Sequence, residues 1–289
     1  MLAILTKKLC KYYGKDLGVK DISLDIEQGE IFGFIGPNGA GKSTLIRSLV
    51  GLLIPTSGSA HILGQDIRTS GSTIRKDIGY LPSEVNYYDE MSSRELLEYH
   101  CRFYGIYDYS EIKRLANIFK LDLDRKITDL SFGNRKKCGI IQSLIHKPKL
   151  LIMDEPTSGL DPLMQSIFFE MLRDEHKKGT TIFFSSHILS EVQNLCERAA
   201  IIKDGEIKAT ENIQTLRKKQ MKKVTVVFGQ KLEKLKFIEG IQNQHWQGSK
   251  LTFEYVGPIS DLLKWISDLD IIDVVLEEPD LESIFMNYY

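Results

Sequence analysis

Apolar residues early in the chain alternate with polar ones and then form a continuous run. Ile22, Leu24 and Ile26 alternate with polar neighbours, Gln28-Gly29 is a turn signal, and residues 31–35 are apolar. Alternation is the period of a half-buried strand, and a short apolar run after a turn is typical of a strand buried on both faces. Residues 20–35 therefore predict two strands joined by a tight turn.

Helical periodicity follows in the middle of the chain. Residues 91–105 place apolar and aromatic side chains near one stripe, and Ser92 or Ser93 is a suitable N-cap. A further helix is predicted over residues 111–119.

Two apolar runs, residues 149–153 and 180–184, predict strands of a parallel sheet that is buried on both faces. Residues 162–178 lie between them and predict the crossover helix, which ends at Gly179. The three segments together form a βαβ unit.

The chain changes character after the strand turn at Asp204-Gly205. Residues 217–223 are strongly basic, and a solvated helix end with a linker is favoured here over a patch for anionic lipid. Beyond them, the pattern predicts a small α+β module, with strands over 224–228, 244–247, 251–255 and 271–276 and a helix over 261–269. We expect one domain over residues 1–219 and a second over 220–289.

Composition narrows the classes of protein. Of the 289 residues, 42% are hydrophobic and 27% charged, which is typical of a soluble globular protein, and a formal net charge of -1 argues against nucleic-acid binding. No apolar run reaches the roughly 20 residues of a membrane-spanning helix, and no secretory signal is indicated, so any membrane role is expected to come through a partner. The four scattered cysteines suit a reducing compartment and are interpreted as core thiols.

Residues 36–44, GPNGAGKST, fit the phosphate-binding pattern G-x-x-x-x-G-K-[ST] through Gly36, Gly41, Lys42 and Ser43. Glycines let successive backbone N–H groups converge on phosphate oxygens, and the lysine adds a positive charge. An ordinary Gly-rich turn is the alternative. A strand before and a helix after the loop are the context that the motif requires, and they favour nucleotide binding.

Other polar residues have two interpretations when each is considered alone. Asp154 and Glu155 end an apolar strand, where they could place Mg²⁺ and the attacking water, but they could also form a solvated turn before Pro156. Ser131 could simply cap a helix, and His187 could be structural. The order and spacing of these residues along the chain favour the functional interpretation.

Five segments in order, GPNGAGKST, LSFGN, LLIMDEP, SGLD and SSH, resemble the nucleotide-binding subunit of ATP-binding cassette (ABC) transporters over residues 1–213. The resemblance implies an α/β fold of the P-loop NTPase (RecA-like) class, with an antiparallel β subdomain and a helical subdomain over about residues 84–145. In this family two cassettes close head to tail around two ATP molecules. Each ATP is held by the glycine loop of one cassette and the signature segment, here residues 130–134, of the other.

The family's residue roles transfer to matching positions. The resemblance assigns Glu155 as general base and His187 as the histidine that contacts the γ-phosphate, and it assigns Mg²⁺ to Ser43, Asp154 and Ser83. It assigns contacts with ATP to Tyr13, Gly36, Pro37, Asn38, Gly39, Ala40, Gly41, Lys42, Ser43, Thr44, Ser131, Gly133, Asn134 and Asp161.

Two positions depart from the family pattern. Ser83 stands where the family has a magnesium-contacting glutamine, with Glu84 beside it as a possible substitute. In the signature segment, Phe132 replaces a glycine and Asn134 a glutamine, while Ser131 and Gly133 are retained. We expect a working but slower composite site.

Residues 276–285 resemble the end of ATPases from bacterial ABC-2 type exporters of drugs and antimicrobial peptides. The resemblance implies an ATP hydrolase on the cytoplasmic face of the membrane, with a second cassette, identical or paralogous, and a separate permease as partners. Residues 83–105 would meet the permease, with Tyr87, Tyr88 and Met91 as candidate contacts. A soluble ABC ATPase of translation or DNA repair is the alternative, but such chains carry two cassettes or long coiled-coil insertions. The substrate is left open.

Overall fold

The computed structural model describes residues 1–87, 90–213, 222–229 and 235–277. The chain divides into two compact units, Met1–Asn212 and Ile213–Tyr289. The domain boundary expected at residues 219/220 lies outside the described residues, as do most of the basic run and most of the C-terminal segment 276–285 that resembles the exporter branch.

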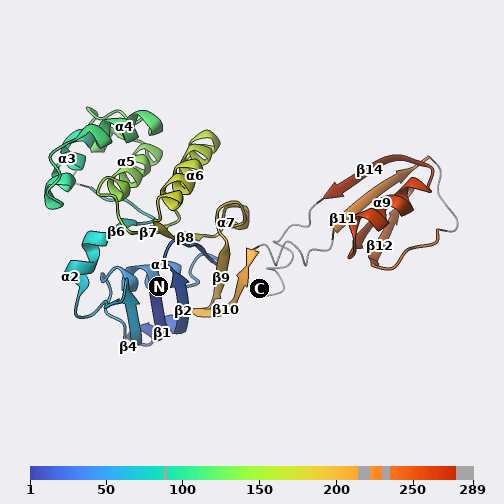
Figure 1. Cartoon of the computed structure of the whole chain (residues 1–289), viewed down its shortest axis with the longest axis horizontal. Coiled ribbons are helices and arrows are strands. Elements are labelled where there is room, and N and C mark those ends of the chain that lie inside the picture. The colour runs from blue at the N-terminus through green and yellow to red at the C-terminus, as the bar shows by residue number, and fades with distance from the viewer. Residues whose placement is uncertain (88–89, 214–221, 230–234, 278–289) are drawn as a thin grey trace. The chain divides into compact units, whose positions relative to one another are not determined.

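A six-stranded sheet forms the centre of the first unit (Figure 1). Its strands run in the order β10 (Glu206–Asn212), β9 (Arg198–Lys203), β3 (Ile31–Ile35), β8 (Thr181–Ser186), β7 (Leu150–Asp154) and β6 (Ile78–Leu81). All neighbours except β10 and β9 are parallel, and every residue of β3, β7 and β8 is buried. The parallel strands predicted over 149–153 and 180–184 are therefore confirmed.

The register of this sheet positions the candidate site. Ile35 lies opposite Ser186, and Asp154 lies opposite Ser185. Parallel strands end at the same edge of a sheet, so the segments that follow β3, β7 and β8 meet there. The glycine loop, Glu155 and His187 are the first residues beyond these strand ends.

A second, antiparallel sheet consists of β2 (Asp16–Glu27), β1 (Leu2–Tyr13), β4 (Ser57–Ile62) and β5 (Gln65–Asp66) in that order. The two strands predicted over residues 20–35 are confirmed as β2 and β3, but they belong to different sheets. The turn at Gly29, with φ of 78°, passes the chain from one sheet to the other. Side chains of both sheets share one hydrophobic core.

Helices cover the central sheet and form a separate group at one side of the unit (Figure 1). The group contains α3, α4 and α5, which all lie within the residues 84–145 expected for a helical subdomain. The predicted helices over 91–105, 111–119 and 162–178 are confirmed as α3, α4 and α6, and Ser92 caps α3 by accepting a hydrogen bond from the Glu95 amide. The helices are α1 (Lys42–Leu49), α2 (Gly71–Ile74), α3 (Ser93–Phe103), α4 (Ser110–Phe119), α5 (Phe132–Leu144), α6 (Pro162–Lys177) and α7 (Leu189–Leu195), with 3-10 turns at Arg75–Asp77 and Ile127–Asp129.

The C-terminal unit is the small α+β module that the sequence predicts. Its antiparallel sheet has the order β12 (Ile241–Gln247), β13 (Lys250–Tyr255), β11 (Lys222–Phe228) and β14 (Ile271–Glu277). Helix α9 (Ile259–Ser267) packs its buried face, including Leu262 and Trp265, against the inward residues of β11 and β13. The predicted strands and helix of this module are therefore confirmed.

All four cysteines are free and buried, which confirms their interpretation as core thiols. Among the residues that the structure describes, no helix is both long enough and apolar enough to span a membrane.

Candidate functional site

The glycine loop between β3 and α1 forms one wall of a cavity of about 630 Å³. Gly39 and Gly41 have φ of 81° and 103°, which side chains rarely adopt, and a Cβ on Gly36 would overlap the carbonyl of Ile202. Among the loop residues proposed to bind ATP, those that line the cavity are Asn38, Gly39, Gly41, Lys42, Ser43 and Thr44. Gly36, Pro37 and Ala40 lie behind this surface and support the loop.

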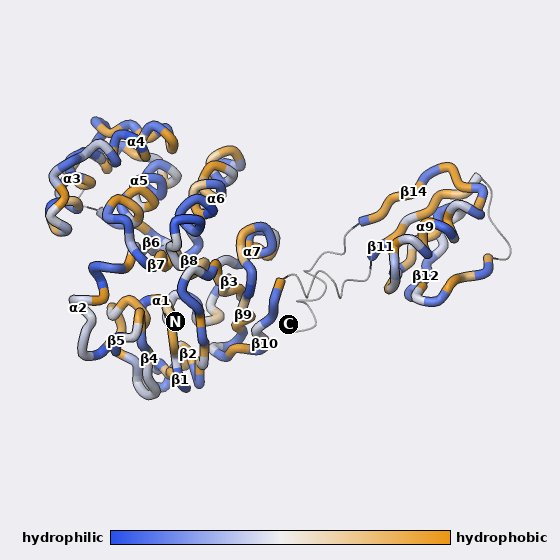
Figure 2. Tube along the Cα trace, in the orientation of Figure 1, coloured by the Kyte–Doolittle hydropathy of each residue, from blue (hydrophilic) through white to orange (hydrophobic). Residues whose placement is uncertain are grey.

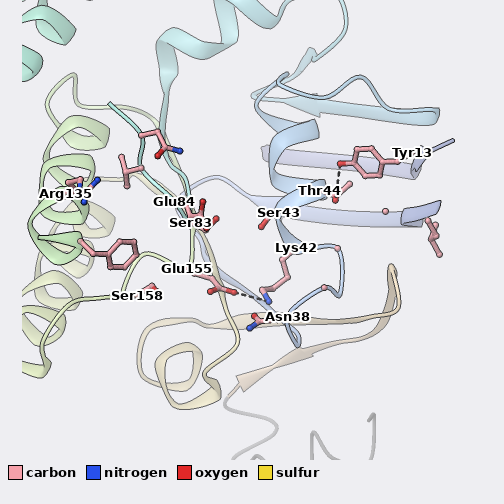
Figure 3. Close-up of a pocket in the computed structure, with 17 residues that line it drawn as sticks. Tyr13, Asn38, Lys42, Ser43, Thr44, Ser83, Glu84, Arg135, Glu155 and Ser158 are labelled. Carbon is pink, nitrogen blue, oxygen red and sulfur yellow. Dashed lines mark hydrogen bonds and ion pairs between the residues drawn. The ribbon is translucent and has the colours of Figure 1, made fainter. Parts of the chain in front are cut away.

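Lys42 is the buried cation of the cavity. Its Nζ donates to the carbonyls of Gly36 and Pro37 at 2.7 and 3.0 Å. These two residues do not line the cavity, but they fix the position of the Lys42 ammonium. The same Nζ lies 3.2 Å from Oε1 of Glu155 (Figure 3). The side chain of Lys42 is only 4% exposed, so its charge is directed at whatever occupies the cavity.

Glu155 follows β7 directly and contacts both Lys42 and His187. Its second oxygen, Oε2, lies 3.3 Å from Nδ1 of His187, while its backbone amide donates to Ser185. Its φ of 46° is unusual for a residue with a side chain, and such strain is typical of functional sites. The structure thus brings the two proposed catalytic residues together beside the glycine loop.

Asp154 ends β7 and is 1% exposed. Its Oδ1 accepts a hydrogen bond of 2.7 Å from Ser185 Oγ, whereas its Oδ2 has no hydrogen-bond partner among the described residues. A buried carboxylate oxygen without a partner is costly unless it binds a cation or water. Ser43 lines the cavity and Asp154 does not, but the hydroxyl oxygen of the first and the unpartnered carboxylate oxygen of the second are hard donors of the kind that suits Mg²⁺.

Tyr13 lies at the far end of the cavity wall, where its hydroxyl is 3.4 Å from Thr44 Oγ1 (Figure 3). Its ring is partly exposed and has the Lys11 ammonium 5.4 Å from its centre, so it presents an aromatic surface beside the phosphate loop. Leu17 and Gly18 complete this end of the cavity. Sequence reasoning missed these two residues, because no motif marks them and only the pairing of β1 with β2 places them there.

Ser83 and Glu84 also line the cavity, so the residue that replaces the family's glutamine does reach the site. Lys136 of α5 holds this segment by donating from Nζ to the carbonyls of Pro82 and Ser83 at 3.1 and 2.8 Å. Lys136 is fully buried, and burial lowers the pKa of its ammonium to about 8 against the opposing effect of Asp154 and Glu155. Sequence reasoning missed Lys136, although it follows the signature segment by two residues.

Most of the signature segment, residues 130–134, does not line the nucleotide cavity. Ser131 caps α5 and its Oγ accepts a hydrogen bond from the Asn134 amide at 3.3 Å, so the N-cap interpretation is confirmed. Ser131, Gly133 and Asn134 do not line the cavity of their own chain, whereas Phe132 and Arg135 do. The structure therefore does not bring these three proposed ATP contacts to the nucleotide cavity of their own chain.

The segment SGLD packs against the signature segment. A Cβ on Gly159, which has φ of 78°, would overlap the ring of Phe132. Asp161 caps α6 by accepting a hydrogen bond from the Met164 amide at 2.9 Å, and it does not line the cavity either. The ring of Phe132, which replaces the family's glycine, thus fits because Gly159 opposite it has no side chain.

Known proteins identify this arrangement. The family model described as ABC transporter matches residues 19–158. The chain is 31% identical to the bacitracin transport ATP-binding protein BcrA of Bacillus licheniformis, over 98% of this chain and 96% of that protein. The chain belongs to the ABC transporter family. This ABC cassette therefore binds and hydrolyses ATP, and the predicted α/β P-loop fold is confirmed.

Two further similarities place the cassette within the family. It is 37% identical to the linearmycin resistance ATP-binding protein LnrL of Bacillus subtilis (strain 168), over 68% of this chain and 65% of that protein. A solved structure of an ATP-binding subunit of an ABC transporter matches with a TM-score of 0.69 and 30% identity, over 74% of this chain and 92% of that one.

The cassette has a second, mainly apolar groove of about 760 Å³ beside the helical group. Tyr87, Leu96, Tyr99 and Phe103 line it, and the Phe103 side chain is 70% exposed. Of the candidate contacts named from the sequence, Tyr87 lines this groove, Met91 does not, and Tyr88 lies outside the described residues. Residues 84–86 line both the groove and the nucleotide cavity, so one segment separates the two.

Proposed function

We propose that the cassette powers export of drugs or antimicrobial peptides through a separate membrane subunit. The observation that carries this proposal is the similarity to the bacitracin transport protein, which extends along 98% of the chain and thus includes the C-terminal unit. Similarity confined to the cassette would be weaker support, because the nucleotide site serves many kinds of ABC protein. The similarity to the linearmycin resistance protein points to the same class of substrate.

The geometry of the cavity supports specific roles in hydrolysis. The glycine loop and Lys42 would bind the β- and γ-phosphates, and Ser43, Asp154 and Ser83 would hold Mg²⁺, which would neutralise phosphate charge. Glu155 accepts the proton of the attacking water, and His187 contacts the γ-phosphate. Tyr13 offers its ring to the adenine.

The contact between Lys42 and Glu155 suggests how ATP prepares its own hydrolysis. Lys42 holds one oxygen of Glu155 at 3.2 Å, so without nucleotide that oxygen is engaged with the ammonium. The more highly charged phosphates attract Lys42 away from Glu155. That exchange would leave this Glu155 oxygen free to contact the attacking water once nucleotide is present.

A second cassette completes the site. Ser131, Gly133, Asn134 and Asp161 do not line the cavity of their own chain, and the N-terminus of α5, which the first three residues form, favours an anion. These residues would contact ATP bound to the glycine loop of a second copy or of a paralogue.

The apolar groove is the proposed docking site for a helix of the membrane subunit. Its aromatic side chains offer a large apolar surface, and the shared segment 84–86 would connect helix position to the nucleotide cavity. This contact would place the cassette at the cytoplasmic face of the membrane.

Drug susceptibility of cells tests the proposal. The cassette would be expressed with the membrane protein encoded beside it, and the minimum inhibitory concentrations of bacitracin and linearmycin would be measured. We expect resistance with the wild type and with Glu170→Gln, an exposed control on α6, but not with Glu155→Gln. If no tested drug distinguishes these variants while ATP hydrolysis depends on Glu155, the exporter assignment is wrong and the ATPase assignment stands.

A further inference from the structure

The two edges of the C-terminal sheet differ in a way that bears on assembly. At one edge, β12 has polar residues from Gln242 to His245, a register shift between these two, and Asn243 at φ of 50°. Polar residues and irregular pairing are devices that keep an edge strand from pairing with another chain. Within the described residues, the outer side of β14 at the other edge pairs with no strand.

Strand β14 has fewer of these protective features. Its pairing with β11 is regular from Lys223 to Val227, with one register shift between Asp273 and Ile271 at the start of the strand, and its sequence, IIDVVLE, contains two acids but no proline or lysine. Ile272, Val275 and Leu276 are 72%, 42% and 40% exposed. Figure 2 shows that much of β14 is hydrophobic. A regular, exposed and apolar edge strand is a template for another strand.

The positions of the acids show that β14 is complementary to itself. In a symmetric antiparallel pair, hydrogen-bonded and non-bonded positions alternate, so the two-fold axis must pass between two copies of one residue. With the axis at Asp273, two aspartates face each other. With the axis at Val275, Asp273 faces Glu277. Like charges directly opposite are unfavourable, which excludes both registers.

An axis at Val274 avoids these conflicts. Ile272 then faces Leu276, Asp273 faces Val275, and every residue of Ile271–Glu277 has a partner. An axis at Ile272 or Leu276 also separates the acids, but part of the strand is then left unpaired. The register centred on Val274 is therefore the most favourable.

We propose that β14 pairs with β14 of a second copy of this chain, antiparallel and centred on Val274, so that the two C-terminal sheets become one. The pairing is a contact between chains in addition to the ATP-dependent contact of the cassettes. It rests on the C-terminal unit alone and does not depend on the proposed export function.

Cysteine cross-linking tests the register in the full chain without nucleotide, so that the cassettes do not contribute. The native cysteines are all buried, and Val274→Cys is a small change at a half-buried position. In the proposed register the two copies of Val274→Cys lie directly opposite each other, close enough for a disulfide. The two copies of Ile272→Cys are displaced by four residues along the strands, roughly 13 Å, which is too far. We expect oxidation with copper phenanthroline to yield covalent dimers for Val274→Cys and not for Ile272→Cys. Equal yields for the two variants would overturn the proposal.

Charge substitutions test the same register without cysteine. Val275 is exposed and pairs with Thr225 in its own sheet, so Val275→Asp is expected to fold normally. The new acid would face Asp273 of the second copy twice, once on each side of the axis, and weaken dimerisation about tenfold. Adding Asp273→Lys to this variant should restore dimerisation by pairing opposite charges.

Sedimentation equilibrium of the nucleotide-free full chains gives the dissociation constants, and circular dichroism checks that each variant is folded. Failure of Asp273→Lys to rescue Val275→Asp would reject the register. If the dimerisation of the wild type and both variants is the same, β14 is not the interface, and a segment of another protein or of this chain covers the edge.

Discussion

At the residue scale, the most informative side chain is Glu155, which contacts the Lys42 ammonium with one oxygen and the His187 ring with the other. Its backbone is fixed by Ser185 on the neighbouring strand, so the carboxylate cannot easily turn away. These contacts orient the carboxylate before nucleotide arrives. In the role proposed for Glu155, Lys42 would release one carboxylate oxygen when it is drawn to phosphate.

We predict that Glu155→Gln lowers the rate of ATP hydrolysis by about 10²–10⁴-fold, the usual contribution of a general base. The amide has nearly the same shape but cannot accept the proton, so the affinity for ATP should be retained. Phosphate release gives the rate and a fluorescent ATP analogue gives the affinity. Glu170→Gln on the exposed face of α6 is the control and should match the wild type. A Glu155→Gln protein that hydrolyses ATP at nearly the wild-type rate would remove this residue from the role of base.

Lys136 shows how a residue outside the motifs can matter for the site. Its buried ammonium has two carbonyl acceptors, Pro82 and Ser83, and the second belongs to a residue that lines the cavity. Lys136 thereby ties α5, which carries the signature segment at its start, to the proposed magnesium contact.

We predict that Lys136→Met raises the concentration of Mg²⁺ that hydrolysis requires and lowers the stability of the fold only modestly. Two carbonyls lose their donor, which costs roughly 1–3 kcal/mol each, but removal of a buried charge offsets part of that cost. The concentration of Mg²⁺ for half-maximal activity should therefore rise with a modest fall in the unfolding temperature. Lys137→Met, at the next position of α5, should change neither quantity. A loss of stability without any shift in the Mg²⁺ requirement would make Lys136 purely structural.

At the element scale, helices α3 and α5 are joined by a small aromatic cluster beside the apolar groove. His100 on α3 lies 5.6 Å from His146, just beyond α5, and Tyr104 stacks on His146 at 4.1 Å. Gln142 of α5 lies within hydrogen-bond distance of His100 Nδ1, at 3.1 Å. Burial lowers the pKa of His100 to about 4, with a further contribution from His146, and burial also lowers the pKa of His146.

This cluster makes stability depend on pH. Because the pKa of His100 is lower in the folded chain than its usual 6.5, the unfolded chain binds more protons between pH 6.5 and 4. The stabilisation by neutral His100 is complete above pH 6.5 and is lost as the pH falls towards 4, by at most about 3 kcal/mol. We predict that His100→Phe, which keeps an aromatic ring against Tyr104, flattens the pH dependence of urea unfolding in this window. Equal slopes for wild type and variant would show that His100 titrates normally.

Segments whose burial is dictated by local sequence could be predicted. The runs 149–153 and 180–184 are mostly apolar because both faces of β7 and β8 are covered, and the glycine loop is recognised by the backbone conformations that only glycine adopts easily. Their neighbours in space could not be predicted in the same way. Residues 20–35 predict two strands, yet nothing local shows that β2 pairs with β1 and leaves β3 to another sheet.

The candidate site shows the same division. The motifs named Lys42, Glu155 and His187, and the sheet register brings them together because parallel strands end at one edge. Lys136 and Gly18 were missed because their importance depends on segments far away in the sequence, Pro82–Ser83 for one and the cavity wall for the other. Contacts between segments that are far apart in the sequence produce no periodic pattern or motif spacing by which a single sequence could reveal them.

At the scale of the whole molecule, the proposed ATP site combines residues of two chains. Lys42 and Glu155 line the cavity, while Ser131 of the same chain does not. If two chains associate head to tail, each site combines the glycine loop of one chain with the signature segment of the other. Defects in these two parts should then complement each other between chains, whereas two defects on the same side of the site should not.

We predict that Lys42→Ala and Ser131→Arg are each inactive alone but recover activity when mixed. Ser131 is exposed at the start of α5, and loss of its cap should cost only about 1 kcal/mol, so the arginine blocks the site without unfolding the chain. In a mixed dimer, one site has both an intact glycine loop and an intact signature segment. With random pairing, half of the dimers are mixed, so ATP hydrolysis should reach about a quarter of the wild-type rate.

The control mixture contains Lys42→Ala and Glu155→Gln, whose defects lie in the same half of the site, so every dimer lacks a working site and no activity should return. Recovery of activity in both mixtures would contradict the two-chain site, because the control dimers contain no intact site. Recovery in neither would mean that each chain completes its own nucleotide site, and the role proposed for Ser131 towards a second copy would have to be abandoned.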